Sequence, residues 1–503
     1  MSRTFDIEAL DKQLEKMFDE SRFPNISVAI RGPEGMIYKR GFGRRRLDPE
    51  LPVDENTIYG IASMSKSFTT LALAILQTEG KVNFDDPVAK HFPDFRVPGI
   101  PKSAVTLRHL AMHTAGIPPI QPLEWSIAMN STERENEWSH KMREASPNKM
   151  DTIEDIIDYI AAGDYMVPGY TTLGWPGEYM SYSNEGYAIL SYVVDKVAGM
   201  TLEEFLKERV FGPLEMNRTV LDVDGSEIRE IAKETDETNS PDHNIAALFE
   251  KDEKSKLVWD DNYSILPPFR GCACVKSTAE DMSHYYLALA DGGKWNGKQV
   301  IPAEAIELMV GAAFPLNYIR HYCLGLNKRS MAGRIICDHS GGLHGVSTQG
   351  GFIMGGSADD TPYSVVVLCS QGDVEPEDFN WTCYNMILGL SLETKHYTGW
   401  VPVEEEFSDP EMLVGDYVVA EGETQHFILS YDNGGDSKKY QVPTLHGDFR
   451  GTDVILKYCG GTRFEAFKES NPEERVYPME FFIKDGKAIK VKCGSRIYQR
   501  IDE

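Results

Sequence analysis

The sequence lacks long apolar runs, and it has few basic residues for its length. No stretch approaches the roughly 18 consecutive apolar residues that a membrane-spanning helix needs, so we expect no membrane partner. Lys and Arg number 51 against 78 Asp and Glu, a net charge of -27. Because nucleic acids and anionic membranes attract clustered cations, this balance disfavours both as partners. The first residues include Asp and Glu and no apolar export segment, so we expect a cytoplasmic protein.

Cysteine and histidine spacing favours neither a redox motif nor a metal site. The eight cysteines include no C-x-x-C pair, and we expect reduced, mostly buried thiols. Cys272 and Cys274 lie in an apolar run, which fits structural thiols better than redox chemistry. His109 and His113 stand four apart and could present two zinc ligands, but no H-E-x-x-H motif or third ligand accompanies them. We therefore expect neither a metal nor a cofactor.

The usual motifs of three large enzyme classes are also missing. The sequence contains no G-x-S-x-G, no P-loop and no G-x-G-x-x-G after a strand. These absences argue against an α/β-hydrolase, a P-loop NTPase and a dinucleotide-binding enzyme.

The chain divides into a long part of mixed α and β character and a short all-β part. At 503 residues it exceeds what one hydrophobic core usually serves. Near residue 400 the composition becomes rich in Pro and acidic residues, and short alternating apolar runs follow. We expect a larger domain over 1–398, a linker over 399–410 and a small β-barrel over 411–503. Apolar periodicity predicts helices over residues 5–21, 63–80, 153–162, 185–199 and 278–293.

A serine and a lysine stand three residues apart where a polar loop runs into an apolar helix, in the run Ser63-Met64-Ser65-Lys66. Because positions i and i+3 share one helix face, the Lys66 amine can lie beside the Ser63 hydroxyl. Burial disfavours a charged lysine and so lets Lys66 accept a proton, while the N–H groups of a first helical turn favour an anion there. The motif S-x-x-K is common by chance, so a surface Ser and Lys is the alternative.

Two further motifs carry groups suited to the same chemistry. Tyr182-Ser183-Asn184 precedes a predicted helix, where a phenol and an amide can face a cleft, and a positive neighbour would help Tyr182 relay a proton. The run Asp338-His339-Ser340-Gly341-Gly342 follows an apolar stretch, and its glycines allow a strand to approach a ligand closely. Each motif alone also has a purely structural interpretation. The first could be an exposed turn, and the second could be a sheet edge whose histidine is hydrogen-bonded.

In this order, the three motifs resemble the S-x-x-K, Y-x-N and [KH]-[ST]-G triplets of the serine β-lactamase and penicillin-binding-protein superfamily. Roughly residues 8–395 resemble its class C β-lactamase branch, which includes D-aminopeptidases, esterases and lovastatin-type acyltransferases. The resemblance implies an α+β fold: an antiparallel sheet flanked by helices beside an all-helical region, with the active site between them. The all-β tail resembles the lipocalin-like barrels appended to some members.

The resemblance also implies roles for the motif residues. The N–H groups of Ser63 and Gly342 would form an oxyanion hole. Position 339 departs from the β-lactamase pattern, which has Lys there; a largely neutral His weakens the case for recognition of a substrate carboxylate. The expected catalytic residues are Ser63, Lys66 and Tyr182, and the expected substrate-binding residues are Asn184, His339, Ser340, Gly341 and Gly342.

We expect a metal-independent serine hydrolase that cleaves an amide, lactam or ester of a small molecule or short peptide through an acyl-Ser63 intermediate. An acyltransferase would use the same acyl-enzyme with an alcohol or amine in place of water. A non-catalytic binding protein of this fold is the third hypothesis, against which the complete S-x-x-K and Y-x-N motifs argue. The substrate and the oligomeric state stay open. Pocket-lining residues are expected among Trp125, Trp138, Tyr170 and Trp175.

Overall fold

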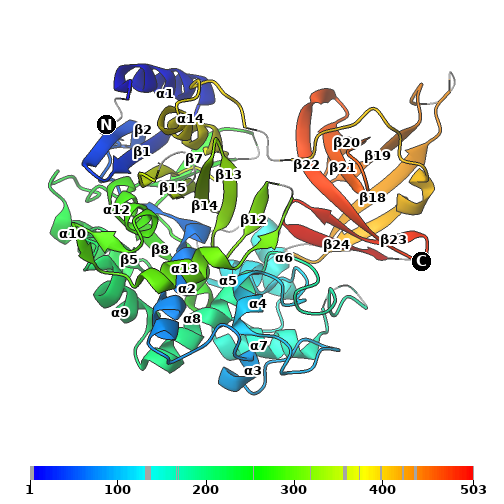
Figure 1. The fold of residues 1–503 in the computed structure, drawn as a ribbon, viewed down its shortest axis with the longest axis horizontal. Coiled ribbons are helices and arrows are strands. Elements are labelled where there is room, and N and C mark those ends of the chain that lie inside the picture. The colour runs from blue at the N-terminus through cyan, green and yellow to red at the C-terminus, as the bar shows by residue number, and fades with distance from the viewer. Residues whose placement is uncertain are drawn as a thin grey trace.

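The computed structural model describes residues 5–130, 137–165, 167, 169–252, 254–317, 319–354, 360–372, 374–396, 399–421, 424–435 and 439–501. They form an antiparallel sheet covered by helices, a mostly helical region next to it, and a closed β-barrel to one side of both (Figure 1). The predicted α+β architecture with an all-β barrel after it is confirmed.

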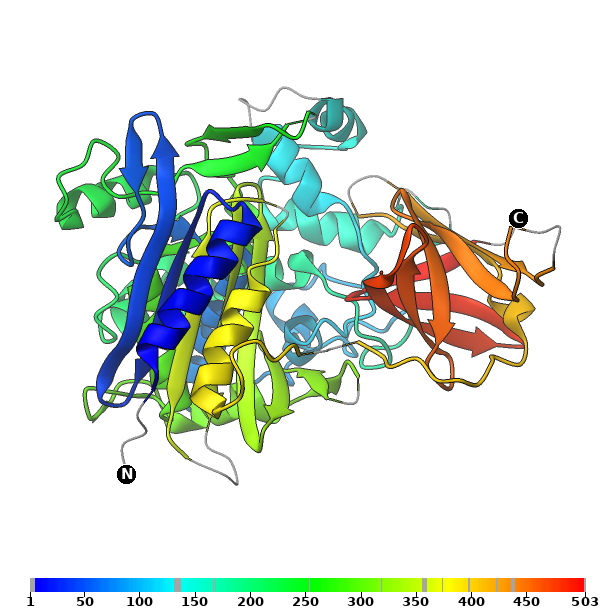
Figure 2. The ribbon, with the colours of Figure 1, turned by 90° about the horizontal axis from the view of Figure 1, so that it is seen from above.

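Nine strands of the described chain form the large sheet, in the order β11-β12-β13-β14-β15-β16-β1-β2-β3. Successive side chains of a strand point to opposite faces, and both faces are covered here. Val365 and Val367 of β16 pack against α1 (Ile7–Ser21) and α14 (Glu377–Leu388), which lie side by side (Figure 2). Val366 and Leu368 belong to the core that contains α12 (Ala279–Ala290). The strands are β11 (Phe314–Pro315), β12 (Arg320–Tyr322), β13 (Asn327–Met331), β14 (Arg334–Leu343), β15 (Val346–Met354), β16 (Tyr363–Cys369), β1 (Asn25–Gly32), β2 (Gly35–Leu47) and β3 (Glu50–Pro52).

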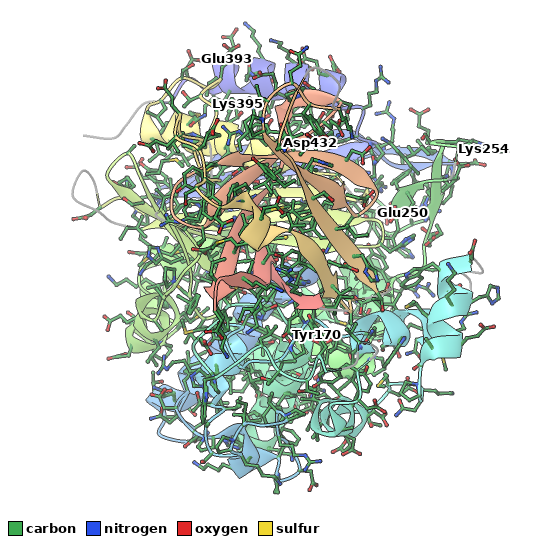
Figure 3. All side chains as sticks on the ribbon, turned by 90° about the vertical axis from the view of Figure 1, so that its right-hand side faces the viewer. Tyr170, Glu250, Lys254, Glu393, Lys395 and Asp432 are labelled. Atoms are coloured by element: carbon green, nitrogen blue, oxygen red, sulfur yellow. The ribbon has the colours of Figure 1, made fainter. Side chains whose placement is uncertain are left out.

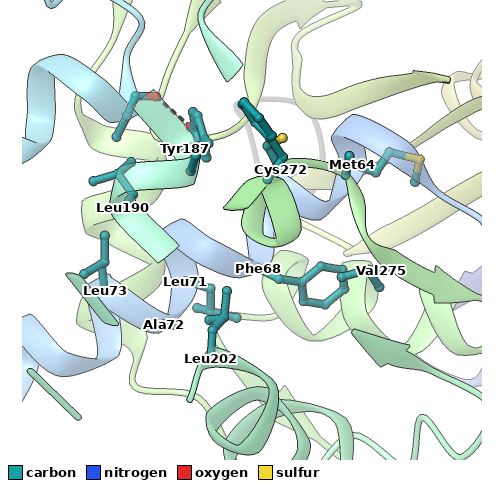
Figure 4. Packing of buried hydrophobic residues seen from close by; sticks show 14 of the residues in the cluster. Met64, Phe68, Leu71, Ala72, Leu73, Tyr187, Leu190, Leu202, Cys272 and Val275 are labelled. Atoms are coloured by element: carbon teal, nitrogen blue, oxygen red, sulfur yellow. Dashed lines mark hydrogen bonds between the residues drawn. The ribbon is translucent and has the colours of Figure 1, made fainter. Parts of the chain in front are cut away.

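The segment predicted as a buried helix over 63–80 begins with the short helix η1 (Ala62–Met64) and continues as α2. Residues Ser65 to Leu76 are all buried. Figure 4 shows Phe68 and Leu71 of α2 in the same core as Tyr187 and Leu190 of α8. Because α2 is enclosed along most of its length, the groups at its start are held by a rigid element.

The other predicted helices are present within three residues of the expected bounds. In the described part of the chain, no helix has the length and the apolar character needed to cross a membrane. The helices are α1 (Ile7–Ser21), α2 (Ser65–Thr78), α3 (Val88–His91), α4 (Leu107–Ala111), α5 (Pro122–Asn130), α6 (Glu137–Ala145), α7 (Ile153–Ala162), α8 (Asn184–Ala198), α9 (Leu202–Leu206), α10 (Ser226–Thr235), α11 (Arg270–Ala273), α12 (Ala279–Ala290), α13 (Ala303–Gly311) and α14 (Glu377–Leu388).

The C-terminal strands close into a barrel that has its own apolar core. Its last hairpin, β23–β24, docks on the helical region. The Tyr182 N–H donates to the Ser495 carbonyl at 2.8 Å, and the Tyr170 hydroxyl, labelled beside the barrel in Figure 3, donates to the Ile497 carbonyl at 3.3 Å. The barrel therefore touches the predicted Y-x-N motif directly. Its strands are β17 (Gly415–Val419), β18 (Gln425–Asp432), β19 (Thr444–Phe449), β20 (Thr452–Tyr458), β21 (Arg463–Lys468), β22 (Asn471–Lys484), β23 (Lys487–Cys493) and β24 (Arg496–Ile501).

Candidate active site

Ser63 lies on η1 and Lys66 in the first turn of α2. Lys66 is fully buried, whereas Ser63 is partly exposed. The Lys66 Nζ donates to Ser63 Oγ at 3.0 Å, to Asn184 Oδ1 at 2.9 Å and to the Cys272 carbonyl at 3.2 Å. These three contacts hold the amine against the serine hydroxyl. Ala62, just before Ser63, has a left-handed φ of 44°, a conformation that costs a residue with a Cβ about 1 to 3 kcal/mol.

Tyr182 and Asn184 enter the site at the start of α8. Ser183 is the N-cap residue: its Oγ accepts from the Gly186 N–H, which determines where the helix begins. The Lys66 Nζ lies 4.8 Å from the centroid of the Tyr182 ring. The Y-x-N motif and the S-x-x-K motif therefore meet at Lys66, although 118 positions separate Lys66 from Asn184.

The third motif lies on β14, which runs beside η1. A Cβ at Gly341 would overlap the Ile61 carbonyl oxygen and Thr348 Oγ1, so only glycine allows the strand to approach η1 this closely. At Gly342, by contrast, a Cβ would meet nothing within 4 Å. Ser340, Gly341 and Gly342 line a cavity of 1180 Å³. The structure thus places the glycine strand against the turn that carries Ser63.

A hydroxyl beside a buried amine, with a phenol and an amide around it and a glycine strand next to it, is suited to acyl transfer to serine. Comparison with known proteins agrees. The family model described as Beta-lactamase matches residues 10–382. The chain belongs to the beta-lactamase family.

Individual members of the beta-lactamase family match over a shorter range. Penicillin-binding protein 4* of Bacillus subtilis (strain 168) is 30% identical over 210 residues, which are 42% of this chain and 40% of that protein. The chain thus aligns with about two fifths of that relative.

Two solved structures share the fold. The octameric penicillin-binding protein homologue from Pyrococcus abyssi is 23% identical with a TM-score of 0.62, over 98% of this chain and 99% of that chain, so the likeness includes the barrel. A D-stereospecific amidohydrolase from Streptomyces sp. is 19% identical with a TM-score of 0.55, over 76% of this chain and 99% of that chain.

His339, the departure from the lysine of β-lactamases, belongs to a buried hydrogen-bond chain. His113 Nδ1 accepts from the Ser183 N–H at 3.0 Å, so its Nε2 carries the proton and donates to the Tyr322 hydroxyl at 3.1 Å. The Tyr322 hydroxyl then donates to His339 Nε2 at 3.1 Å, and His339 Nδ1 donates to the Ser340 carbonyl at 2.5 Å. Burial lowers the pKa of His339 to about 4. The residue is therefore neutral at pH 7, and a role in substrate binding stays a prediction.

Arg496 is a site residue that the sequence analysis missed. It begins β24 of the barrel, and its Cζ lies 4.7 Å from the centroid of the Tyr182 ring. Its guanidinium pairs with both carboxylate oxygens of Glu421 at 2.5 and 2.6 Å. No local motif marks Arg496, because only the docking of the barrel brings this residue to the candidate active site.

Of the four aromatic residues expected to include pocket-lining side chains, Trp138 lines the 1180 Å³ cavity. Trp125 and Tyr170 are buried in the core, and Trp175 is 58% exposed. Trp125 and Tyr170 therefore stabilise the fold of this region. The cavity wall also includes Glu250, on a hairpin that the sequence showed only as an inserted stretch.

The two histidines weighed as zinc ligands point to different partners. His109 is part of the capping box of α4 with Thr106, and His113 joins the chain to Tyr322. Within the described residues, no group of three or more His, Cys, Asp or Glu side chains is arranged to hold a metal ion.

Glu185, next to Asn184, predicts a pH dependence of stability. It is 3% exposed, and its carboxylate accepts from Ser183 Oγ at 2.8 Å. Burial raises its pKa from 4.5 to about 7. Because the folded state binds this proton more tightly than the unfolded state, the stabilisation is complete below pH 4.5. It is lost as the pH rises to 7, by up to about 3 kcal/mol.

Urea unfolding at pH 5 and pH 8 tests this pH dependence. The unfolding free energy of Glu185→Gln should fall less between pH 5 and pH 8 than that of the wild type. The exposed control Glu208→Gln should match the wild type; if Glu185→Gln matches it too, Glu185 does not cause the loss.

Proposed function

We propose that this chain is a metal-independent serine hydrolase that cleaves an amide, lactam or ester of a small molecule or short peptide through an acyl-Ser63 intermediate. The contact of Lys66 Nζ with Ser63 Oγ at 3.0 Å carries the proposal. The amine reaches the hydroxyl from a fully buried position and is oriented by Asn184. Membership of the beta-lactamase family supports the same chemistry.

In the proposed reaction, Ser63 Oγ attacks the substrate carbonyl carbon while its proton passes to the Lys66 and Tyr182 pair. The N–H groups of Ser63 and Gly342 stabilise the oxyanion, and one such donor typically lowers the barrier by about 3 to 4 kcal/mol. The leaving group departs with the proton and leaves an ester on Ser63. Water then attacks this ester, and the same pair takes its proton and returns it to Ser63 Oγ.

Acyl transfer to an alcohol or amine is the alternative outcome of the same intermediate. The 1180 Å³ cavity beside Gly342 has room for an acceptor as well as for water. Adding a small alcohol such as methanol during turnover, and measuring the ratio of methyl ester to free acid, separates the two outcomes.

Intact-protein mass spectrometry tests the proposal. Wild-type protein incubated with p-nitrophenyl acetate or benzylpenicillin should gain the mass of one acyl group, and peptide mapping should place that group on Ser63. Ser63→Ala should gain none, whereas a control change at the exposed Ser103, Ser103→Ala, should behave as the wild type. EDTA should leave the rate unchanged. An adduct on another residue, or turnover that EDTA removes, contradicts the proposal.

A further inference from the structure

A second cavity, of 340 Å³, lies between the edge of the sheet and the barrel. The sheet side contributes Arg320 and Ser340, and the barrel side contributes Tyr477 and Lys492. Tyr182 also lines it, so this cavity adjoins the candidate active site. A ligand in this cavity therefore lies beside Tyr182 of the candidate site.

Arg320, the first residue of β12, faces this cavity and also the 1180 Å³ cavity. Its Nε donates to Asn327 Oδ1 at 3.2 Å, but none of the described residues accepts from its two terminal nitrogens or pairs with its charge. The nearby Asp338 is already paired with Arg329 at 2.6 Å. Burial lowers the pKa of Arg320 and the nearby Arg329 lowers it further, whereas the carboxylates of Asp338 and Glu377 oppose this effect without an ion pair to Arg320 among the described residues.

Lys492 brings a second cation to the same space from β23 of the barrel. It is 8% exposed, and its Nζ donates to the Leu316 carbonyl at 3.4 Å, a long contact for an ammonium. Burial lowers the pKa of Lys492 to about 8, against the opposing effect of Glu480 on the adjacent strand. Glu480 also lies 3.9 Å from Arg463. Two cations from different parts of the fold thus face one cavity that contains a single carboxylate among its lining residues.

About half of the other lining residues are apolar or aromatic, and they can contact an apolar part of a ligand. They include Leu316, Trp400, Val476, Tyr477 and Pro478.

We propose that this cavity is an anion subsite, in which Arg320 and Lys492 bind the carboxylate of an apolar N-acylated amino acid or short peptide. A guanidinium with two unpaired terminal nitrogens can bind a carboxylate in a bidentate manner. The proposal rests on the proposed function and adds a substrate class to it. It also accounts for a neutral residue at position 339, because the charge that recognises the carboxylate lies on β12 and β23 instead.

Calorimetry on the full chain with Ser63→Ala tests the proposal without turnover, so its outcome is separate from that of the acyl-Ser63 experiment. The probes are N-acetylphenylalanine and N-acetylphenylalaninamide, each as both enantiomers, which differ only in the carboxylate. The acid should bind about tenfold or more tightly than the amide for at least one enantiomer. Arg320→Gln should remove this difference by weakening the acid alone, and Lys492→Met should reduce it by a smaller factor.

The matched control is Lys487→Met, which removes the same charge from an exposed position on the same strand. It should leave both affinities within about twofold of the parent. Equal binding of acid and amide, no binding of the acid at millimolar concentration, or an unchanged acid affinity in Arg320→Gln would each overturn the proposal. If Arg320→Gln does not fold, Arg320→Lys replaces it; by keeping the charge but losing the fork it should retain only part of the preference.

Discussion

Replacing Ser63 by alanine is expected to abolish turnover with the fold intact, and Lys66→Met is expected to lower kcat by about four orders of magnitude or more. Ser63 is the proposed nucleophile, and the Lys66 amine is the group that the structure holds 3.0 Å from its oxygen. Methionine is the better substitution at position 66, because alanine would leave a cavity in a fully buried position.

The losses of activity caused by Ser63→Ala and by Lys66→Met should not add in the double variant. Nucleophile and proton acceptor act as one unit, so the double variant should be no slower than Ser63→Ala alone. Initial rates on p-nitrophenyl acetate, with melting temperatures for every variant, provide the measurement. Lys81→Met, an exposed change just beyond the end of α2, should keep the wild-type rate. Substantial turnover by pure Ser63→Ala would place the acylation elsewhere.

Gly341→Ala is expected to lower kcat by about 100-fold or more. A Cβ at this position overlaps the Ile61 carbonyl oxygen, a backbone atom that cannot rotate away, and Thr348 Oγ1. The strand must therefore move away from η1, and this displaces the Gly342 N–H from the oxyanion that it is proposed to bind.

Gly311→Ala is the control. It adds the same methyl group at the end of α13, outside the candidate site, where a Cβ meets nothing within 4 Å. The rate on a small ester should therefore stay within a few-fold of the wild type. Comparable rates for the two variants would show that the close approach of β14 to η1 is not needed for catalysis. Circular dichroism and melting temperature separate a local shift from unfolding.

Local sequence was a good guide to the elements and the motifs. The apolar positions of α2 follow a helical period and the barrel strands alternate, so both were predicted from residues near one another in the chain. The turn that carries Ser63, the start of α8 and the glycines of β14 are likewise local patterns. The aromatic residues between 117 and 182 were a poorer guide to the lining of the pocket. Only the packing of the helices decided that Trp138 lines a cavity while Trp125 is buried.

The sequence by itself determined which groups are available for chemistry: a serine and a lysine one helical turn apart, a Y-x-N motif, and a strand with glycines. Only the tertiary structure decided their surroundings. It brings Asn184 to Lys66, shields His339 so that it is neutral, and places Arg496 and Lys492 of the barrel beside residues of the sheet and helices. The physical reason is that charge state, close approach and pairing depend on contacts between segments more than 100 residues apart. No pattern of neighbouring residues encodes such contacts, because they form only when separate surfaces pack together.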